Sequence, residues 1–255
     1  MSEEPAALQG RYARQLLIEG WGAAVQDRLL GTTVFVVGAG ALGSAAATYL
    51  VGAGVGRVSI VEGGQVELSQ LHSQSLHFGP DIGASKAESA AIKLSLMNPE
   101  VHVDPFPAFV DDQNADLILE DADCVLDCSN DVKTAYLIND SCTRSGTSFA
   151  TAAVTGFDGR MLTVNPRESA CLRCIRDKGA GLLDEQAETA GLAGPAAGVV
   201  GSLQALEALK IAAAVGEPSY GKLLTFNGRK PSLISHDISQ RADCTCANAP
   251  GAATV

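Results

Sequence analysis

The first half of the chain alternates between short apolar runs and segments with helical spacing. Residues Thr32–Val37 form a run rich in β-branched side chains, apolar on both faces as a buried parallel strand would be. In Lys86–Met97 the apolar residues recur at helical intervals, and the pattern stops at Asn98-Pro99. Further strands are predicted at Val58–Val61, Val101–Val103, Ala122–Asp127 and Ser148–Ala153, and helices within Arg11–Leu30.

After about residue 151 the pattern changes to that of antiparallel hairpins. The stretch "TGFDGRMLTVNP" alternates around Asp158-Gly159, and a second hairpin is predicted about Asn227-Gly228, between Leu223–Phe226 and Ser232–His236. A helix is predicted over Gly198–Ala214. The fold class is therefore α/β, a Rossmann-like doubly wound, mainly parallel sheet with added antiparallel C-terminal strands.

We expect a single domain over residues 1–255. Its nucleotide-binding part would cover about residues 30–150, and a C-terminal part with antiparallel strands about residues 151–246.

A glycine-rich turn follows the first strand. Gly38, Gly40 and Gly43 form G-x-G-x-x-G, and a helix is predicted from about Ala41. This spacing gives a tight turn, close backbone approach to a phosphate and free N–H groups at a helix N-terminus. Glu62 ends the second strand, where an acidic residue can bind a ribose hydroxyl. The motif predicts a bound nucleotide, NAD or ATP, and the alternative is a crossover whose glycines serve packing only.

Composition narrows the functional class. The 255 residues include 18 basic and 29 acidic side chains, a net charge of −11, so we expect no nucleic-acid partner. No basic and apolar leader opens the sequence, which favours a cytoplasmic location. The uncharged run Thr189–Leu206 is interrupted by glycines and a proline and closed by Glu207 and Lys210, so we expect no membrane span.

Four of the seven cysteines form two close pairs. The pairs "CLRC" and "CTC" contain Cys171, Cys174, Cys244 and Cys246. Four thiolates brought together by folding predict a structural zinc site, with unpaired thiols as the alternative and disulfides less favoured in a cytoplasmic chain. The C-x-C spacing is tighter than the usual C-x-x-C, and Ala247 stands where a ligand is expected. Cys124, Cys128 and Cys142 are predicted to be buried apolar residues.

Several segments occur together in an order that resembles a known family. They are "RYARQ", "VGAGALGS", "AGVG", "LSQLHSQ", "SKAESA", "VLDCSND", "CLRC" and "GVVGSLQALEALK". Over roughly Arg11 to Cys246 the chain is similar to the ThiF/MoeB adenylyltransferases, relatives of the ubiquitin-activating enzymes. This resemblance implies ATP rather than NAD, Mg²⁺, and adenylylation of a carboxylate. In the family that carboxylate is usually the C-terminal diglycine of a small ubiquitin-like sulfur carrier, and members are homodimers or heterodimers.

The resemblance also implies roles for individual residues. Gly38, Gly40 and Gly43 match the phosphate turn, and Lys86 matches the phosphate-binding lysine. Gln74 matches a nucleotide contact. Arg14 matches an arginine that reaches the γ-phosphate in the opposite subunit.

Other positions depart from the family pattern. Glu62 replaces the ribose aspartate, Gly64 a second aspartate, and Gln70 an asparagine. Ser73 replaces a phosphate-binding arginine and so removes a permanent charge. Ala187 stands where relatives that form a thiocarboxylate or thioester carry a cysteine.

The most serious departure concerns magnesium. Asn130 stands where the family has the aspartate that binds magnesium. We expect Asn130 to contact the nucleotide, but its side chain carries no charge. A neutral amide is a weak ligand for this ion. Asp131, one residue along, would have to compensate.

Two hypotheses remain open. The chain is either an adenylyltransferase with a reworked site, using Arg14, Lys86 and Asp131 on a carrier protein or peptide, or a catalytically degenerate homologue. The degenerate homologue would serve as the non-catalytic half of a heterodimer, supplying Arg14 in trans, or as a module that binds a peptide or carrier. In either case we expect a dimer, with Leu192–Leu209 forming part of the buried surface.

Overall fold

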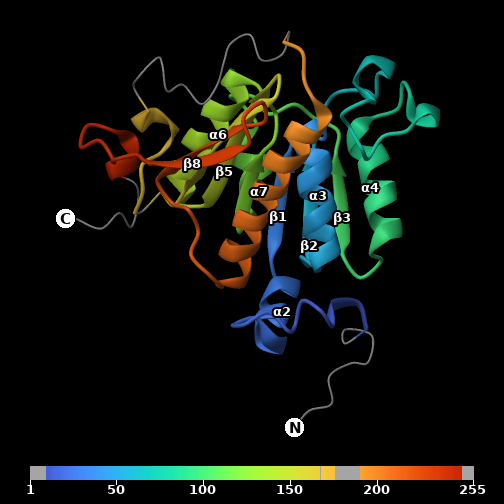
Figure 1. The fold of residues 1–255 in the computed structure, drawn as a ribbon, viewed down its shortest axis with the longest axis horizontal. Coiled ribbons are helices and arrows are strands. Elements are labelled where there is room, and N and C mark those ends of the chain that lie inside the picture. The colour runs from blue at the N-terminus through green and yellow to red at the C-terminus, as the bar shows by residue number, and fades with distance from the viewer. Residues whose placement is uncertain (1–9, 167, 176–189, 249–255) are drawn as a thin grey trace.

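One mixed sheet organises the protein. The computed structural model describes residues 10–166, 168–175 and 190–248, and these residues form an eight-stranded sheet of order β3-β2-β1-β4-β5-β6-β7-β8 (Figure 1). Strands β1 to β5 are parallel, and β6, β7 and β8 continue the same sheet with antiparallel pairing. The strands are β1 (Thr33–Val37), β2 (Arg57–Val61), β3 (His102–Phe106), β4 (Cys124–Asp127), β5 (Ser148–Thr155), β6 (Asp158–Val164), β7 (Lys222–Asn227) and β8 (Ser232–Asp237).

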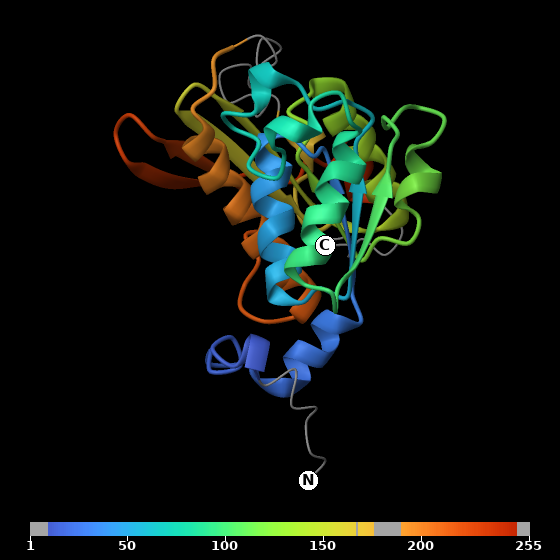
Figure 2. The ribbon, with the colours of Figure 1, turned by 90° about the vertical axis from the view of Figure 1, so that its right-hand side faces the viewer.

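Helices cover both faces of the parallel strands. One face carries α3 (Ala41–Ala53), α4 (Lys86–Met97) and α7 (Gly194–Ala213), and the other carries α5 (Ala115–Leu119) and α6 (Val132–Ser145). Helix α2 (Gly22–Leu30) and the residues before it lie beyond the amino ends of the strands (Figure 2). Single helical turns occur at Leu68–Gln70 (η1), Gly79–Asp81 (η2), Leu172–Cys174 (η3) and Thr245–Asn248 (η4).

The apolar runs of the sequence become strands that are buried on both sides. Val34 and Val36 of β1 pack in the core beneath α3 and α7, whereas Phe35 and Val37 pack in the core beneath α5 and α6. Because successive side chains of a strand point to opposite faces, such a strand has no polar face. The double burial explains why the sequence of β1 does not alternate.

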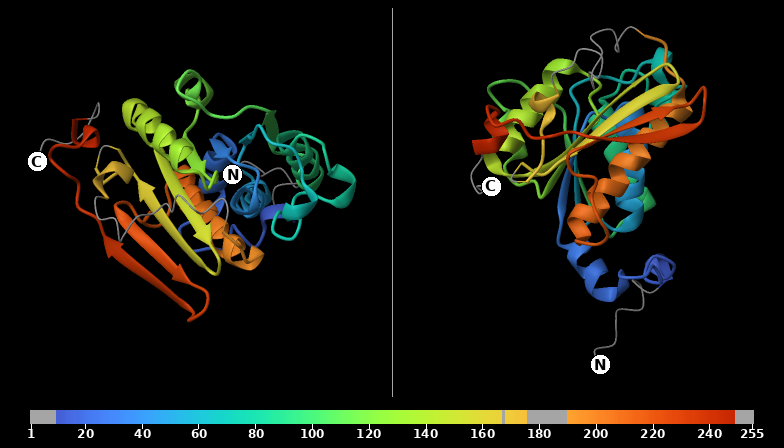
Figure 3. Two further views of the ribbon diagram at one scale, coloured as in Figure 1. Left: turned by 90° about the horizontal axis from the view of Figure 1, so that it is seen from above. Right: turned by 60° about the vertical axis from the view of Figure 1, so that its left-hand side comes forward.

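Helix α7 is apolar enough in length and composition to cross a membrane, but half of its apolar stretch is buried within the protein. It packs closely along α3, where a Cβ atom added at Gly201 would lie 2.4 Å from the carbonyl oxygen of Leu42. This burial is that of a core helix. Seen from above, α7 lies beside the antiparallel strands that extend the sheet (Figure 3).

The predicted fold class is confirmed, with local corrections. The first hairpin turns at Gly156 and Phe157, not at Asp158-Gly159, which begin β6. Gly156 has a φ of +61°, a conformation that glycine adopts without strain, and this decides where the chain reverses.

The boundaries of two further elements differ from the prediction. Helix α7 begins at Gly194, four residues early, because Pro195 is well tolerated in a first helical turn. Strand β3 runs over His102–Phe106 instead of Val101–Val103, and α5 and α6 were not predicted. The helix over Lys86–Met97 is confirmed.

Two glycines of α3 should respond in opposite ways to substitution by alanine. A Cβ atom at Gly43 would lie 1.8 Å from the carbonyl oxygen of Gly38, so Gly43→Ala should cost roughly 1–3 kcal/mol of stability by overpacking. Gly52 has nothing within 4 Å of its added Cβ, and Gly52→Ala should stabilise by about 0.5–1 kcal/mol. Urea unfolding of both variants measures the difference, and equal shifts would contradict the packing argument.

Candidate functional site

The strand order reverses between β1 and β4, and the loops that follow these two strands touch. In open α/β sheets, ligands bind at such a switch point, outside the carboxyl ends of the strands. Gly38, with a φ of +102°, follows β1, and a Cβ atom there would lie 2.6 Å from the carbonyl oxygen of Cys128 after β4. Only glycine fits this contact.

The glycine turn presents unpaired backbone donors. Gly40 is the N-cap of α3 and has no side chain to accept from the first N–H groups of the helix. The N–H groups at a helix N-terminus and the helix dipole favour an anion. Gly38, Gly40 and Gly43 therefore lie together as the motif predicted.

A pocket of about 370 Å³ opens beside this turn. Its walls come from the ends of β1 and β2, the loop after β3 and the loop after β4, and they comprise Val37, Gly38, Val61, Glu62, Ala108, Phe109, Val110, Ser129, Asp131 and Thr134. Phe109 is 68% exposed although its ring lies against Gly63, where a Cβ atom would be 2.5 Å from the ring. The pocket thus combines apolar lining residues with the carboxylates of Glu62 and Asp131.

Glu62 joins the turn to the end of β2. Its Oε2 accepts the Ala39 N–H at 3.1 Å, and its Oε1 accepts the Gly64 N–H at 2.7 Å. A Cβ atom at Gly64 would lie only 2.9 Å from Oε1. A side chain at position 64 would therefore compete with the Glu62 carboxylate for this space.

Lys86 and Gln74 bring unpaired polar atoms to the same place. Lys86 begins α4 and is 8% exposed, and its side chain has no hydrogen bond or ion pair with any described residue. Its Nζ lies 3.8 Å from the Cβ position of Gly64. Gln74 lies beside Gly40, donates to Gln70 Oε1 at 3.1 Å, and has a buried Oε1 without a partner in the described chain. Buried unpaired groups of this kind are costly unless a ligand binds them.

The loop after β4 is held by a buried carboxylate. Asp127 accepts from the Ser129 hydroxyl and the Thr151 hydroxyl, both at 2.6 Å, and burial raises the pKa of Asp127. The loop therefore has a fixed shape before any ligand binds.

Asn130 and Asp131 differ in what they face. Asn130 has a φ of +57°, and its amide accepts the Val154 N–H at 3.0 Å and donates to the Val154 carbonyl at 3.4 Å. Asp131 caps α6 by accepting the Thr134 N–H at 2.7 Å and also lines the pocket. A nucleotide contact by Asn130 stays a prediction, because the structure gives its side chain another partner.

Ser73 leaves the phosphate side of the site without a guanidinium. Its hydroxyl donates to the Gln70 carbonyl at 3.1 Å, and its Cα lies 3.2 Å from the Cβ position of Gly194. Ala187, another departure from the family pattern, lies outside the described residues.

Arg14 is exposed and lies at the opposite edge of the sheet. Its segment is fastened to the C-terminal ends of α3 and α4, where Gln15 donates to the Ala53 carbonyl and Asn98 donates to the Tyr12 hydroxyl, each at 2.8 Å. Five residues of β1, about 16 Å, separate this edge from the glycine turn. The structure does not bring Arg14 to the pocket of its own chain.

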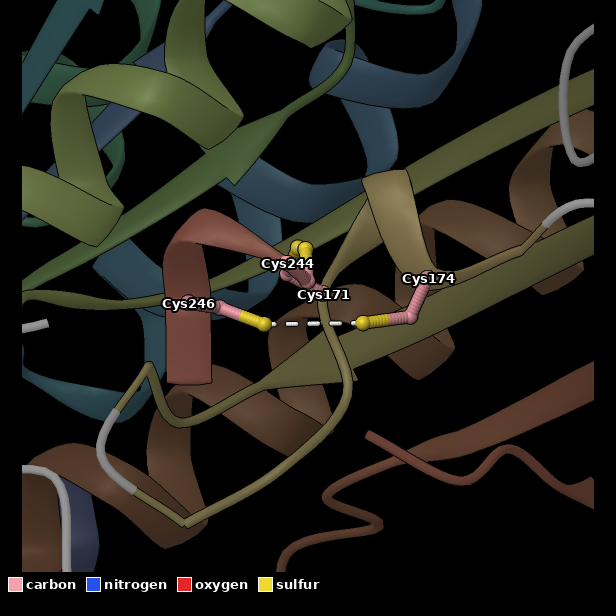
Figure 4. Close-up of side chains that lie close together, drawn as sticks. All are labelled: Cys171, Cys174, Cys244 and Cys246. Carbon is pink, nitrogen blue, oxygen red and sulfur yellow. Dashed lines mark hydrogen bonds between the residues drawn. The ribbon is translucent and has the colours of Figure 1, made fainter. Parts of the chain in front are cut away.

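The four paired cysteines are brought together (Figure 4). Cys171 and Cys174 lie at η3, Cys244 and Cys246 at η4, and all four sulfur atoms are buried within 4.8 Å of one another. The Sγ–Sγ distances between Cys171 and Cys244 and between Cys174 and Cys246 are both 3.5 Å, which is too long for a disulfide bond. Tetrahedral zinc with Zn–S bonds of about 2.3 Å places its sulfurs about 3.8 Å apart, so the cluster fits this ion.

Two site residues had not been predicted from the sequence. Phe109 follows β3 at the strand end, and an exposed aromatic residue there could have been noticed once β3 was placed correctly. His77 is buried behind the glycine turn and contacts the Ala39 carbonyl. Its sequence neighbours carry no spacing signal for this contact.

Comparisons with known proteins agree with the geometry. Residues 12–248 match the ThiF family. Over 248 residues, 94% of this chain and 91% of the relative, the chain is 38% identical to the sulfur carrier protein adenylyltransferase of Thermus thermophilus. It is also 38% identical to the adenylyltransferase and sulfurtransferase MOCS3 of Drosophila grimshawi, over 94% of this chain but only 54% of the relative, about half its length.

Solved structures show the same fold. Escherichia coli MccB, in a crystal structure with MccA-N7isoASN, superposes with a TM-score of 0.83 at 20% identity. The match covers 96% of this chain and 76% of that one.

Proposed function

Because this chain belongs to the ThiF family, we propose that it binds ATP and adenylylates the carboxyl end of a small ubiquitin-like sulfur-carrier protein or of a peptide. The observation that carries the proposal is the ammonium of Lys86, buried and unpaired beside Glu62 and the glycine turn. A buried cation without a partner is stable only if a bound anion neutralises it. The Thermus relative is named for the transfer of an adenylyl group to a sulfur carrier protein.

Each wall of the pocket has a part in the proposed complex. The N–H groups at Gly40 and the start of α3, with Lys86, hold the phosphates. Glu62 keeps acceptor capacity on both oxygens for the ribose hydroxyls, and Gln74 Oε1 accepts a further donor. Phe109 borders the space left for the base.

Asp131 would hold Mg²⁺ in this chain. Its carboxylate lines the pocket, whereas the amide of Asn130 is bound to Val154, and Mg²⁺ prefers anionic oxygen. When bound, the ion neutralises charge on the phosphates. In the reaction, a carboxylate oxygen of the acceptor forms a bond to the α-phosphorus, the bond to the β-phosphate oxygen breaks, and pyrophosphate leaves. Lys86 and the backbone donors stabilise the charge that develops.

A second candidate function is that of a supporting half in a heterodimer. It is favoured by Ser73, which brings no charge to the phosphates, and by Arg14, which lies at the far edge and has no ion pair with a described residue. In this case the chain binds ATP, its own adenylylation is slow, and Arg14 acts in the site of an active homologue. In both cases residues 30–150 and 151–246 act as one domain, because both contribute strands to one sheet. We also propose a cytoplasmic location.

Exchange of pyrophosphate with ATP tests the function. The purified chain should bind ATP in calorimetry and show slow exchange with a carrier that ends in Gly-Gly. Asp131→Asn should lower that exchange by about 10²–10³, since it removes one charge that stabilises the transition state. Asp112→Asn is the control, because Asp112 is exposed and pairs with the exposed Lys133. Ser73→Arg should raise the rate. Absence of ATP binding would overturn the proposal, and rapid exchange by the unmodified chain would reject the supporting-half alternative.

Mixing two variants tests whether Arg14 acts across a dimer. The chain should scatter light as a dimer, with the exposed Tyr49, Val199 and Leu206 between α3 and α7 as part of the interface. Arg14→Ala and Lys86→Met should each impair the site. If the subunits of a mixture exchange at random, about a quarter of all sites should be intact, because about half of the dimers are mixed and each mixed dimer has one site with both Lys86 and Arg14. The readout is pyrophosphate exchange, or the preference for ATP over ADP in binding. No recovery in mixed dimers, or a monomer at all concentrations, contradicts the arrangement.

The cysteine cluster should bind one zinc ion per chain in a structural role, because four thiolates leave no open position for water. Cys246→Ser should lose the metal and lower the melting temperature, since metal binding energy is folding energy. Cys142→Ala is the matched control: Cys142 is buried in α6, outside the cluster, and this variant should keep its zinc. Elemental analysis of protein purified without chelator decides, and an absence of zinc refutes the assignment.

A further inference from the structure

A half-buried lysine lies behind the glycine turn, on the side away from the pocket. The Nζ of Lys93 contacts Asp81 Oδ2 at 2.5 Å, Ser89 Oγ at 2.8 Å and the Ser89 carbonyl at 3.2 Å. The ring of Phe78 covers it at 5.0 Å. Because an ammonium only donates, Ser89 Oγ must accept from Lys93, and its own proton is shared between two neighbouring acceptors, the Asp81 carboxylate and His77 Nδ1.

His77 connects this serine to the glycine turn. Its Nδ1 lies 2.9 Å from Ser89 Oγ, and its Nε2 lies 2.9 Å from the Ala39 carbonyl oxygen. A carbonyl only accepts, so Nε2 carries the proton and Nδ1 accepts the hydroxyl of Ser89. Burial lowers the pKa of His77, and the charges of Lys93 and Lys86 act in the same direction, so the ring is neutral. The hydrogen bonds then run in one direction, from Lys93 through Ser89 and His77 to Ala39.

The last acceptor belongs to the phosphate-facing peptide group. The Ala39 carbonyl and the Gly40 N–H are the two ends of one amide. A hydrogen bond to the oxygen withdraws electrons from the nitrogen and makes the N–H a stronger donor. The Gly40 N–H has no acceptor among the described residues, and the neighbouring Ala39 N–H is held by Glu62. The turn is thus fixed from both sides, and the Gly40 N–H is left for a ligand.

We propose that His77 is a positioning residue that relays the charge of Lys93 to the Gly40 N–H, which binds a phosphate of the nucleotide. The inference rests on the proposed function for the identity of that anion. The relay strengthens a backbone donor at a site where Ser73 brings no guanidinium. It acts on phosphate and not on adenosine, because it ends at the glycine turn.

Three substitutions interrupt the relay at different points. Lys93→Met removes the charge and keeps the length of the side chain, and Ser89→Ala removes the connecting hydroxyl. His77→Gln keeps an N–H donor for the Ala39 carbonyl, but its acceptor, the amide oxygen, lies beside that donor and not at the Nδ1 position that faces Ser89. Lys230→Met is the charge control, because Lys230 is exposed in the turn between β7 and β8, several strands away from the glycine turn after β1.

Binding of ATP and of adenosine separates the relay from a structural effect. Lys93→Met and Ser89→Ala should weaken ATP binding roughly 3- to 10-fold, the size of one weakened charge-assisted hydrogen bond, and leave adenosine binding unchanged. His77→Gln should fall between them and the unmodified protein. Equal losses for ATP and adenosine, or the same loss in Lys230→Met, would overturn the proposal.

Amide resonances read the relay without any ligand. In a nitrogen–proton correlation spectrum, Lys93→Met and Ser89→Ala should move the Gly40 amide proton upfield, whereas Gly52 in the same helix should stay in place. The nitrogen shifts of His77 should report a proton on Nε2. If the protein binds no ATP but Gly40 shifts, the proposed function fails and the relay stands. If Gly40 does not respond, the relay is refuted whatever binds.

Discussion

The contact between Gly38 and the carbonyl of Cys128 is the constraint on which the site depends. At the place where the strand order reverses, the loops after β1 and β4 approach so closely that a Cβ atom at Gly38 would lie 2.6 Å from the Cys128 carbonyl oxygen. The same contact sets the start of α3, and Gly43 lets that helix approach the turn. A side chain at either position would separate the two loops that form the pocket. The sheet positions the site, and the glycines close it.

Around this contact, the site is made of backbone donors and a small number of charged side chains. Glu62 holds the front of the turn and His77 holds the back, so the Ala39 residue between two glycines has one conformation. The ammonium of Lys86 has no partner among the described residues, and Gly64 beside it brings no carboxylate. The charge of Lys86 is therefore available to a ligand and is not neutralised by an ion pair with a described residue.

The fold was predictable from the sequence where local pattern and burial agree. The parallel strands and the helix over Lys86–Met97 follow from apolar runs and spacing, and the four cysteines from their pairing. The turn at Gly156 was misplaced because Asp158-Gly159 has an equally good local signal, and only strand pairing chooses between them.

The roles of Asn130 and His77 could not be predicted, since each depends on a partner distant in the sequence or on a backbone φ. Asn130 needs Val154 across the sheet, and His77 needs Ala39. Such contacts are properties of the packed structure. Sequence spacing places the residues near the site but does not say what their side chains face.

The pairing of Glu62 with Gly64 has a consequence for how this sequence arose. A side chain at position 64 would place its Cβ 2.9 Å from Oε1, at the end of the flexible Glu62 side chain, so Glu62 would have to turn away and give up its hydrogen bond to the Gly64 N–H. An aspartate at position 64 therefore costs that hydrogen bond as long as Glu62 is present. The path of least cost to a sequence with two aspartates shortens position 62 first, and the reverse path removes the side chain at position 64 first.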